Sequence, residues 1–394
     1  MRRRAVIHWG ISSFFGWGIY GLNLALNWSA DPAIEPLCSF PIDENQVVVD
    51  ALKRRQLAPF LAGSASLQTQ IARYAGGEVA VDVPLLAALG NDFAVPKAAG
   101  DVRLNGRPTV GVVFFEIPQL SEQARANARA LPLIVTGSTW NERILREWGV
   151  DHVRTVIQGV DPTVFHPAPR AGILGDRFKV FSGGKLELRK GQDLVLAAFR
   201  IFAERHPDAL LVTAWHSPWY QFAKAIDLSR RVAPVVYAGD KVDVPGWARA
   251  CGIRDDQFVD LGAVPNAFVP PILREMDVAL FPNRSEGGTN LVAMEAMACG
   301  VPTILSANTG HLDLIEPGNC FALERQNPVS GPGAGVGATP GWGDSDLDEI
   351  VAALETAYSD REDARRRGAA GAETMHRFTW ADTARGMRDI VLSL

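Results

Sequence analysis

Short unbroken runs of apolar residues alternate along this chain with longer segments in which apolar residues recur every three or four positions. Unbroken runs are typical of strands that are buried on both faces of a parallel sheet, and the longer period is typical of helices. Strands are predicted at residues 5–11, 79–89, 107–115, 133–136, 153–157, 178–182, 210–215, 258–263, 277–281 and 301–305. Helices are predicted at residues 138–148, 194–202, 269–275, 290–298, 347–358 and 381–391. This alternation predicts an α/β protein with parallel sheets.

A linker divides the pattern into two halves. Residues 167–172 read PAPRAG, with proline stiffening one end and glycine at the other, and strands alternate with helices on both sides. At 394 residues the chain is long enough for two domains. We therefore predict two doubly wound, Rossmann-like domains that face a cleft, with a ligand at the carboxyl ends of the strands.

The composition narrows the class of protein. With 47% hydrophobic residues, 21% charged residues and a net charge of -5, the chain is typical of a soluble globular protein and shows no nucleic-acid footprint. Its four cysteines have no paired spacing, which argues against a zinc site or a disulfide framework and favours a reducing, cytoplasmic compartment. Polar residues and glycines interrupt the apolar start, so we expect a strand, a turn and a helix there rather than a targeting segment. Membrane contact through the three arginines at residues 2–4 is less favoured than a solvated terminus.

The chemistry is organised by residues 281–306, which read FPNRSEGGTNLVAMEAMACGVPTILS. The pattern predicts a strand, a turn with two glycines, a helix capped at Thr289 or Asn290, and a second strand. Unpaired backbone N–H groups at such a helix N-terminus favour an anion, above all phosphate. The carboxylates of Glu286 and Glu295 accept from hydroxyls but repel phosphate, so the ligand should also carry a polyol. An ordinary strand–helix turn is the alternative.

This stretch resembles the nucleotide-sugar site of retaining GT-B glycosyltransferases, in particular glycosyltransferase family four. That family carries a Glu-x7-Glu motif that runs into a helix similar to LVAMEAMACGVP in this chain. The spacing here is Glu-x8-Glu, and Glu295 matches the second glutamate. Alignment back from Glu295 places Gly287 where the first glutamate usually stands. A turn that is one residue longer would still allow Glu286 to reach the donor sugar, so both readings stay open.

A second motif, GGKLELRKG at residues 183–191, follows a predicted strand and precedes a predicted helix. Lysine suits phosphate as a point charge. The segment is similar to the diphosphate motif of the same family, with Lys185 in the place of its arginine and Lys190 in the place of its lysine. Arg189 is interpreted as a bystander. A solvated basic turn is the alternative to diphosphate binding.

Two features of the first half are candidates for the cleft. Residues 16–21 satisfy the G-x-G-x-x-G spacing, but residues 12–15 separate them from the first strand, which weakens a dehydrogenase reading. In the family that the chain resembles, a glycine-bearing loop after the first strand faces donor and acceptor, and Gly16 and Gly18 would take that part; glycines needed only for a tight turn are the alternative. Glu116 follows a predicted strand and is a candidate acceptor-side residue, although a structural carboxylate is favoured over it.

The remaining segments complete the organisation. Residues 325–344 are rich in glycine and proline and predict a loop. Asp344-Ser345-Asp346 has the D-x-D form of a metal motif, but it precedes a helix, so helix capping is the better explanation. By resemblance, residues 1–168 form the acceptor-side domain, residues 173–374 form the donor domain, and residues 375–394 form a terminal helix that crosses back to the first domain.

The resemblance implies a hexosyltransferase of polysaccharide biosynthesis type that moves a sugar from a nucleotide diphosphate to a sugar, glycan or lipid acceptor, with retention and without a metal or cofactor. Lys185 and Lys190 would stabilise the leaving diphosphate, Glu286 would contact the donor sugar and Glu295 the ribose. The full set of expected donor contacts is Gly16, Gly18, Gly183, Gly184, Lys185, Lys190, Gly287, Gly288, Thr289, Asn290, Leu291 and Glu295. A nucleotide-sugar epimerase and a non-catalytic sugar-nucleotide-binding protein are the alternatives.

Overall fold

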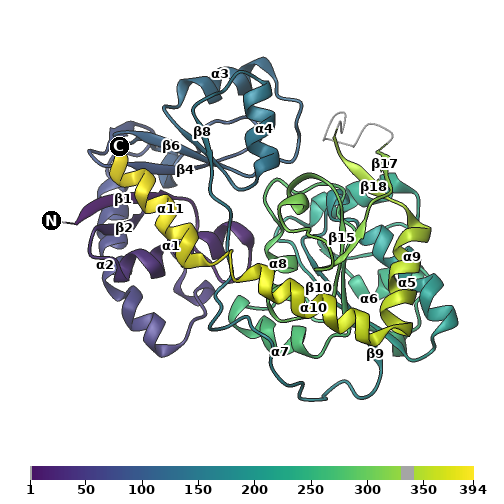
Figure 1. Cartoon of the computed structure of the whole chain (residues 1–394). Coiled ribbons are helices and arrows are strands. Elements are labelled where there is room, and N and C mark those ends of the chain that lie inside the picture. The colour runs from purple at the N-terminus through teal and green to yellow at the C-terminus, as the bar shows by residue number, and fades with distance from the viewer. Residues whose placement is uncertain (1, 330–340) are drawn as a thin grey trace.

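The computed structural model describes residues 2–329 and 341–394, and the described chain forms two lobes, each built on a six-stranded sheet (Figure 1). Every pairing within both sheets is parallel. The predicted fold class, two doubly wound Rossmann-like domains, is therefore confirmed.

The first sheet has the order β2-β1-β4-β6-β7-β8. Its strands in chain order are β1 (Arg3–His8), β2 (Ile34–Cys38), β4 (Leu85–Leu89), β6 (Thr109–Val113), β7 (Ile134–Thr136) and β8 (Val153–Thr155). The apolar run predicted at 79–89 is split, because β3 (Glu78–Ala80) pairs outside this sheet with β5 (Arg103–Asn105). The buried patterns of β1, β4 and β6 explain why unbroken apolar runs predicted them.

Four helices accompany the first sheet: α1 (Gly16–Ala30), α2 (Ala51–Ala72), α3 (Glu122–Ala130) and α4 (Thr139–Glu147). The expectation of a glycine-bearing loop at Gly16 and Gly18 is wrong, because both glycines lie in the first turn of α1. Gly18 is needed for packing, since a Cβ on it would lie 2.5 Å from the Cβ of Ser12. Ser138 caps α4 as predicted, with its side chain accepting from the amide of Asn141.

The second sheet has the order β13-β10-β9-β14-β15-β16. Its strands are β9 (Phe178–Gly184), β10 (Ala209–Trp215), β13 (Phe258–Asp260), β14 (Val278–Phe281), β15 (Thr303–Ser306) and β16 (Phe321–Leu323). Strand β9 lies between β10 and β14, so the strand order reverses at β9. In open α/β sheets, ligands bind outside the carboxyl ends of the strands at such a reversal.

The second lobe contains α5 (Gln192–Arg205), α6 (Val244–Ala250), α7 (Val269–Arg274), α8 (Leu291–Ala298), α9 (Leu347–Ser359) and α10 (Arg361–Met375). The predicted loop at 325–344 is wrong at its two ends, because β17 (Gln326–Pro328) and β18 (Gly343–Ser345) pair as antiparallel strands. Residues 330–340 of that prediction lie outside the described residues. Asp346 caps α9 through its side chain, as expected, and accepts from the amide of Glu349.

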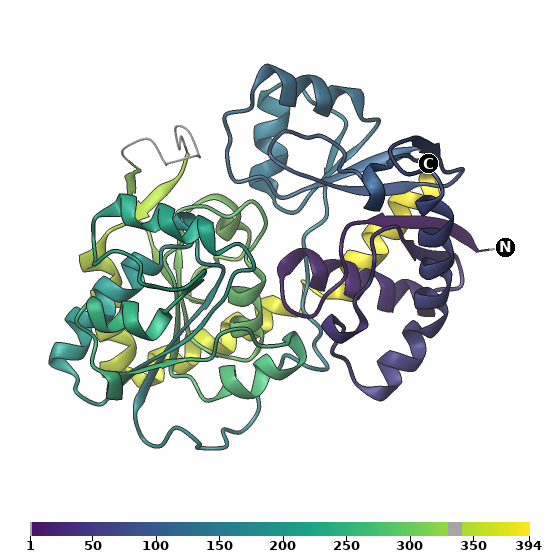
Figure 2. The same ribbon diagram turned by 180° about the vertical axis from the view of Figure 1, so that it is seen from behind.

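The chain crosses between the lobes twice. The predicted linker is held in place, since Arg170 pairs with Asp277 at 2.8 Å. After α10, helix α11 (Trp380–Ser393) returns to the first lobe and packs beside α1; both views show α10 and α11 running across the two lobes in yellow (Figure 1, Figure 2). Where the chain crosses, the amide of Val160 donates to Phe378 and the amide of Trp380 donates to Val160. The exact domain boundaries at 168, 173 and 375 stay predictions.

Within the described residues, no helix combines the length and the apolar character that a bilayer crossing requires.

Candidate active site

The two motif segments meet at the strand reversal of the second sheet. Strand β9 ends in Gly183-Gly184 and leads into η3 (Leu188–Lys190), a short 3-10 helix, and then into α5. Strand β14 ends at Phe281 and leads through the glycine turn into α8. A Cβ on Gly191, which has a φ of +71°, would lie 2.3 Å from the carbonyl oxygen of Pro282, so the two segments touch at a position that only glycine allows.

The glycine turn is packed tightly on every side. Asn290 is the N-cap of α8 and has a φ of +65°, a left-handed conformation that asparagine adopts more readily than most residues; its side chain makes no capping hydrogen bond. A Cβ on Gly287 would lie 2.5 Å from the carbonyl carbon of Phe114, and a Cβ on Gly310 would lie 1.6 Å from the oxygen of Gly288. The first lobe therefore presses against the turn through the end of β6.

The carboxylate of Glu286 meets the cations of the second motif. Its Oε1 lies 2.5 Å from Nζ of Lys190, and its Oε2 lies 3.2 Å from Nη1 of Arg189. Asn283 donates to the same Oε1, and Oγ1 of Thr309 accepts from the amide of Glu286. Lys190 and Glu286 are 96 residues apart in the chain. The structure thus brings together two of the three predicted catalytic side chains.

Arg189 is central to this cluster, so its interpretation as a bystander is wrong. Its guanidinium contacts Glu187 at 2.7 Å and Glu116 at 3.3 Å in addition to Glu286. The side chain is only 12% exposed. Glu187 and Arg189 precede Lys190 in the sequence, but this order did not indicate that the three side chains would be buried together.

Burial and neighbouring charges set the protonation states. Burial alone would raise the pKa of Glu286, but Lys190 and Arg189 outweigh it and lower this pKa to about 2. The pKa of Lys190 is lowered, chiefly because burial disfavours its charge. Burial lowers the pKa of His311 to about 4, so this histidine is neutral at pH 7. It contacts Asn290 at 3.1 Å.

Lys185 lies at the edge of the cluster rather than in it. Its Nζ is 3.9 Å from Glu187 and 5.0 Å from the centroid of the Trp219 ring. Its ion-pair partner Glu187 is also held by Arg189. Lys185 is the most exposed of the three cations in the motif.

Glu295 is buried in α8 and is held from the neighbouring loop. Its Oε1 accepts from Nδ2 of Asn266 at 2.5 Å. Burial raises the pKa of Glu295 to about 8. The amide of Asn266 donates in turn to the carbonyl of Ser13, so a loop of the first lobe lies against this part of the second.

The glycines that were expected to contact the donor lie around the N-terminal end of α8 and Lys190. A Cβ on Gly183 would lie 2.8 Å from Val292 in the first turn of α8, and a Cβ on Gly184 would lie 3.8 Å from Lys190. A Cβ on Gly16 would lie 4.0 Å from the side chain of Leu291. The first turn of α1 therefore approaches the N-terminus of α8, although not as the loop that was expected. Thr289, beside Asn290, is fully buried and its hydroxyl contacts Met294.

Glu116 joins the cluster from the other lobe. Its carboxylate contacts Arg189, and its carbonyl accepts from the indole nitrogen of Trp342 at 2.8 Å. Burial raises the pKa of Glu116. The lobes also meet where Ser138 donates to the carbonyl of Gly287 at 2.7 Å. Glu116 is thus a residue of the interface between the lobes as the structure has it.

The sequence analysis missed a second buried ion cluster, centred on Arg284, which contacts both motif segments. Arg284 makes two bonds to Asp193, at 2.8 and 2.7 Å, and one to Asp344 at 2.7 Å. It also donates to the carbonyl of Leu188 in η3. Asp344 of the D-x-D sequence is therefore engaged by arginine. In the described part of the chain, no group of three or more His, Cys, Asp or Glu side chains is arranged to hold a metal ion.

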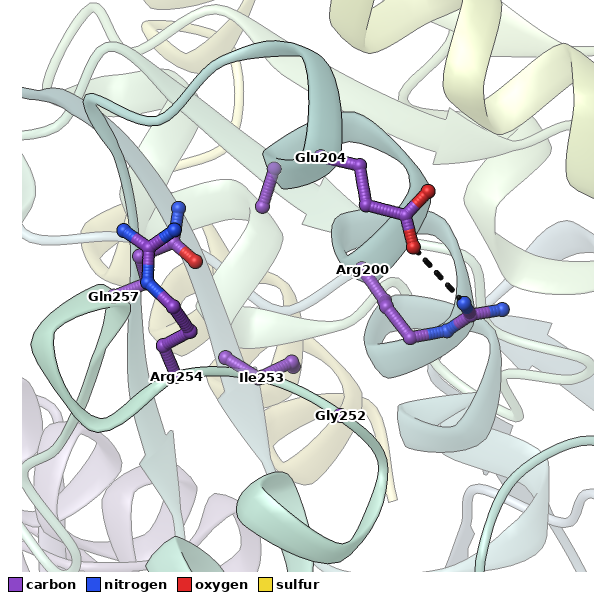
Figure 3. Close-up of a pocket in the computed structure, with 7 residues that line it drawn as sticks. Arg200, Glu204, Gly252, Ile253, Arg254 and Gln257 are labelled. Atoms are coloured by element: carbon purple, nitrogen blue, oxygen red, sulfur yellow. Dashed lines mark hydrogen bonds and ion pairs between the residues drawn. The ribbon is translucent and has the colours of Figure 1, made fainter.

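A separate hollow of about 150 Å³ lies between α5 and η5 (Asp255–Gln257), a short 3-10 helix (Figure 3). Its charged side chains are satisfied, because Arg200 pairs with Glu204 and Arg254 pairs with Asp256. It shares no residue with the cluster around Glu286, so we do not assign the site to it.

Fold and site together define the class. Two parallel-sheet domains with a basic turn and a glycine turn at the strand reversal of the second domain constitute the GT-B architecture of glycosyltransferases. The same architecture is found in sucrose-phosphate synthase from Thermosynechococcus elongatus, with a TM-score of 0.65 and 17% identity over 99% of this chain and 98% of that one. Anabaena HepE in complex with UDP-glucose aligns with a TM-score of 0.61 and 14% identity over 99% of this chain and 100% of that one.

A family model matches the second domain: residues 168–330 match the model of the family described as glycosyl transferases group 1. D-inositol 3-phosphate glycosyltransferase from Arthrobacter sp. (strain FB24) is 27% identical over 240 residues, which are 59% of this chain and 48% of the relative. Mannosylfructose-phosphate synthase from Agrobacterium fabrum is 25% identical over 187 residues, which are 45% of this chain and 38% of the relative. The chain thus spans about half or less of the length of these curated relatives.

Proposed function

We propose that the protein is a retaining, metal-independent glycosyltransferase that moves a sugar from a nucleotide diphosphate to a hydroxyl of a sugar, glycan or lipid acceptor. One observation carries the proposal: Lys190 and Glu286 converge at the N-terminal end of α8, at the strand reversal of the second sheet. Cations and helix amides suit a diphosphate, and an adjacent carboxylate suits the sugar attached to it.

The roles follow from charge and position. Lys190, with Lys185 at the edge, would stabilise the negative charge that grows on the leaving diphosphate, and the backbone amides at residues 289–291 would add donors. Glu286, ionised at neutral pH, would stabilise the cationic character of the sugar at the transition state. Glu295 would exchange its contact with Asn266 for the ribose hydroxyls.

The relatives support the donor class more than the acceptor. HepE binds UDP and UDP-glucose according to its structures, which supports a nucleotide sugar as donor here. The matched relatives are named for transfer to inositol phosphate and for making sugar phosphates. None of these names supports the epimerase alternative. No cofactor beyond the nucleotide sugar is required by the proposed chemistry.

The place of action that we propose is the cytoplasm, with no nucleic-acid partner. Peripheral membrane contact would fall to the arginines at residues 2–4, of which Arg2 and Arg4 are on the surface. Arg2 donates to the carbonyl of Ser29, and Arg4 pairs with Glu35.

The proposal is tested in two steps. First, melting temperatures are measured with UDP, GDP, ADP and TDP, since a ligand at one hundred times its Kd stabilises the folded state by about 2.7 kcal/mol. Second, the corresponding nucleotide sugars are incubated with a panel of neutral and phosphorylated sugar acceptors, and the anomeric configuration of any product is determined. Turnover with retention that survives chelation of divalent ions supports the proposal. Binding without turnover over the whole panel would favour a non-catalytic sugar-nucleotide-binding protein.

A further inference from the structure

Glu286 is held by two different cations on its two carboxylate oxygens. Lys190 contacts Oε1 and Arg189 contacts Oε2. The two cations differ in their surroundings: Lys190 lies beside Gly184 at the end of β9, whereas Arg189 lies between three carboxylates. An ionised carboxylate has two oxygens and about four acceptor positions, so Glu286 can hold both cations at once.

Arg189 and Lys190 also differ in their backbone contacts with the turn that carries Glu286. The carbonyl of Arg189 accepts from the amide of Arg284 at 2.6 Å, and its Nη1 also donates to the carbonyl of Ser285 at 3.4 Å. Arg189 therefore grips the turn that carries Glu286 through both main chain and side chain. Lys190 touches the turn only through its ammonium group in the contacts that the structure shows.

Arg189 also connects the turn to the first lobe. Its Nη2 reaches Glu116, while Ser285 donates to the carbonyl of the same residue at 3.4 Å. A planar guanidinium can meet three carboxylates in fixed directions, which the point charge of a lysine cannot do. The position of the Glu286 carboxylate thus depends on the approach of both lobes.

We propose that Arg189 is a positioning residue, which keeps the carboxylate of Glu286 aimed at the donor sugar when the diphosphate recruits Lys190. This inference rests on the proposed function. The two cations then have different roles: Lys190 binds the leaving diphosphate, and Arg189 positions the carboxylate of Glu286. Through Glu116, the carboxylate reaches its working position only when the lobes are together.

The test uses Arg189→Lys in the full chain, because this variant keeps the charge of the cluster but loses the planar fork. UDP binding, measured by calorimetry, should change less than about threefold, and kcat should fall at least tenfold with little change in the KM for the donor. In Arg189→Met, which removes the charge, the acid limb of kcat against pH should move to higher pH, because the positive charge of Arg189 helps to lower the pKa of Glu286. Lys190→Met should instead lose UDP affinity and kcat together.

Two further variants make the outcome decisive. Glu116→Gln should reproduce part of the loss in kcat without loss of UDP binding, and Arg200→Met, which removes an exposed pair on α5, should match the wild type. Equal losses of UDP affinity and kcat in Arg189→Lys, or an unmoved acid limb in Arg189→Met, would overturn the positioning role. If the wild type itself shows no turnover with any donor, the proposed function fails and this role fails with it; turnover in the wild type with an unchanged Arg189→Lys variant refutes this inference alone.

Discussion

At the scale of single residues, the two glutamates of the site, Glu286 and Glu295, have pKa values that are shifted in opposite directions. Burial disfavours every charged form, yet the cations around Glu286 lower its pKa to about 2. Glu295 pairs with no cation among the described residues, and burial raises its pKa to about 8. Two carboxylates in one site are therefore in different protonation states at pH 7. This difference suits one for electrostatic work and the other for hydrogen bonds with hydroxyls.

Lys190→Ala is expected to reduce kcat by roughly two orders of magnitude or more, because removal of one preorganised electrostatic stabiliser costs that much in other enzymes. Steady-state kinetics with the donor found by the panel measures the effect. Lys97→Ala is the matched control, since Lys97 forms only an exposed pair with Asp101. An unchanged kcat would show that Lys190 does not bind the diphosphate.

Glu295→Gln is expected to change how stability depends on pH. Between the ordinary pKa of 4.5 and about 8, the folded wild type keeps a proton that the unfolded chain has lost, so its free energy of unfolding falls as pH rises. The fall amounts to at most about 1.4 kcal/mol per pH unit. Urea unfolding at several pH values between 5 and 8 should show the variant gaining on the wild type as pH rises; a constant difference would contradict the raised pKa.

At the scale of elements, the site depends on turns that only glycine can make. The turn between β14 and α8 is enclosed by the end of β6 on one side and by Gly310 on the other. The turn between η3 and α5 is enclosed in the same way by Pro282 at Gly191. These close approaches fix the backbone that carries Glu286 and Lys190, so the site is built by main-chain packing as much as by side chains.

Gly287→Ala is expected to destabilise the protein by about 1–3 kcal/mol, because the new methyl group would overlap the backbone at Phe114 and Phe115. Gly10→Ala is the control, since nothing lies within 4 Å of a Cβ there. Thermal and urea unfolding of both variants measure the difference. Equal stability of the two variants would mean that the end of β6 does not press on the turn in solution.

At the scale of the whole molecule, the two lobes share contacts that one sheet alone could not supply. Trp380 belongs to the last helix but stacks on Tyr20 of α1, with ring centroids 5.8 Å apart. Trp28 of α1 donates to the carbonyl of Ala384 in the same last helix. The end of the chain therefore stabilises the beginning and ties the second lobe to the first. Tyr20 also packs on Phe114, which lies against the glycine turn.

Trp380→Ala is expected to cost about 3–5 kcal/mol of stability, as for other buried aromatic residues, and the loss should fall on the first lobe. Calorimetry should show unfolding of that lobe at a lower temperature. Leu392→Ala, a partly exposed position near the end of the same helix, should leave the transition nearly unchanged. Loss confined to the second lobe would show that α11 does not stabilise α1.

The sequence by itself determined most strands of the two sheets and the two motifs. Unbroken apolar runs located ten of the strands, since a parallel strand is buried on both faces and its pattern is local. The cap at Asn290 and the stop after α8 were likewise local signals. The sequence pattern wrongly predicted a loop at residues 16–21. The glycines there, which are common in loops, lie in helix α1, which packs against α2 and α11.

Only the tertiary structure decided which charges meet. The sequence placed Lys190 and Glu286 in one site through a resemblance, but it could not show that Arg189 joins them with Glu116 from the other lobe. Nor could it show that Glu295 is buried without a cation, because burial and pairing depend on segments far apart in the chain. Local pattern encodes secondary structure, whereas the electrostatics of the site arise from packing across the chain.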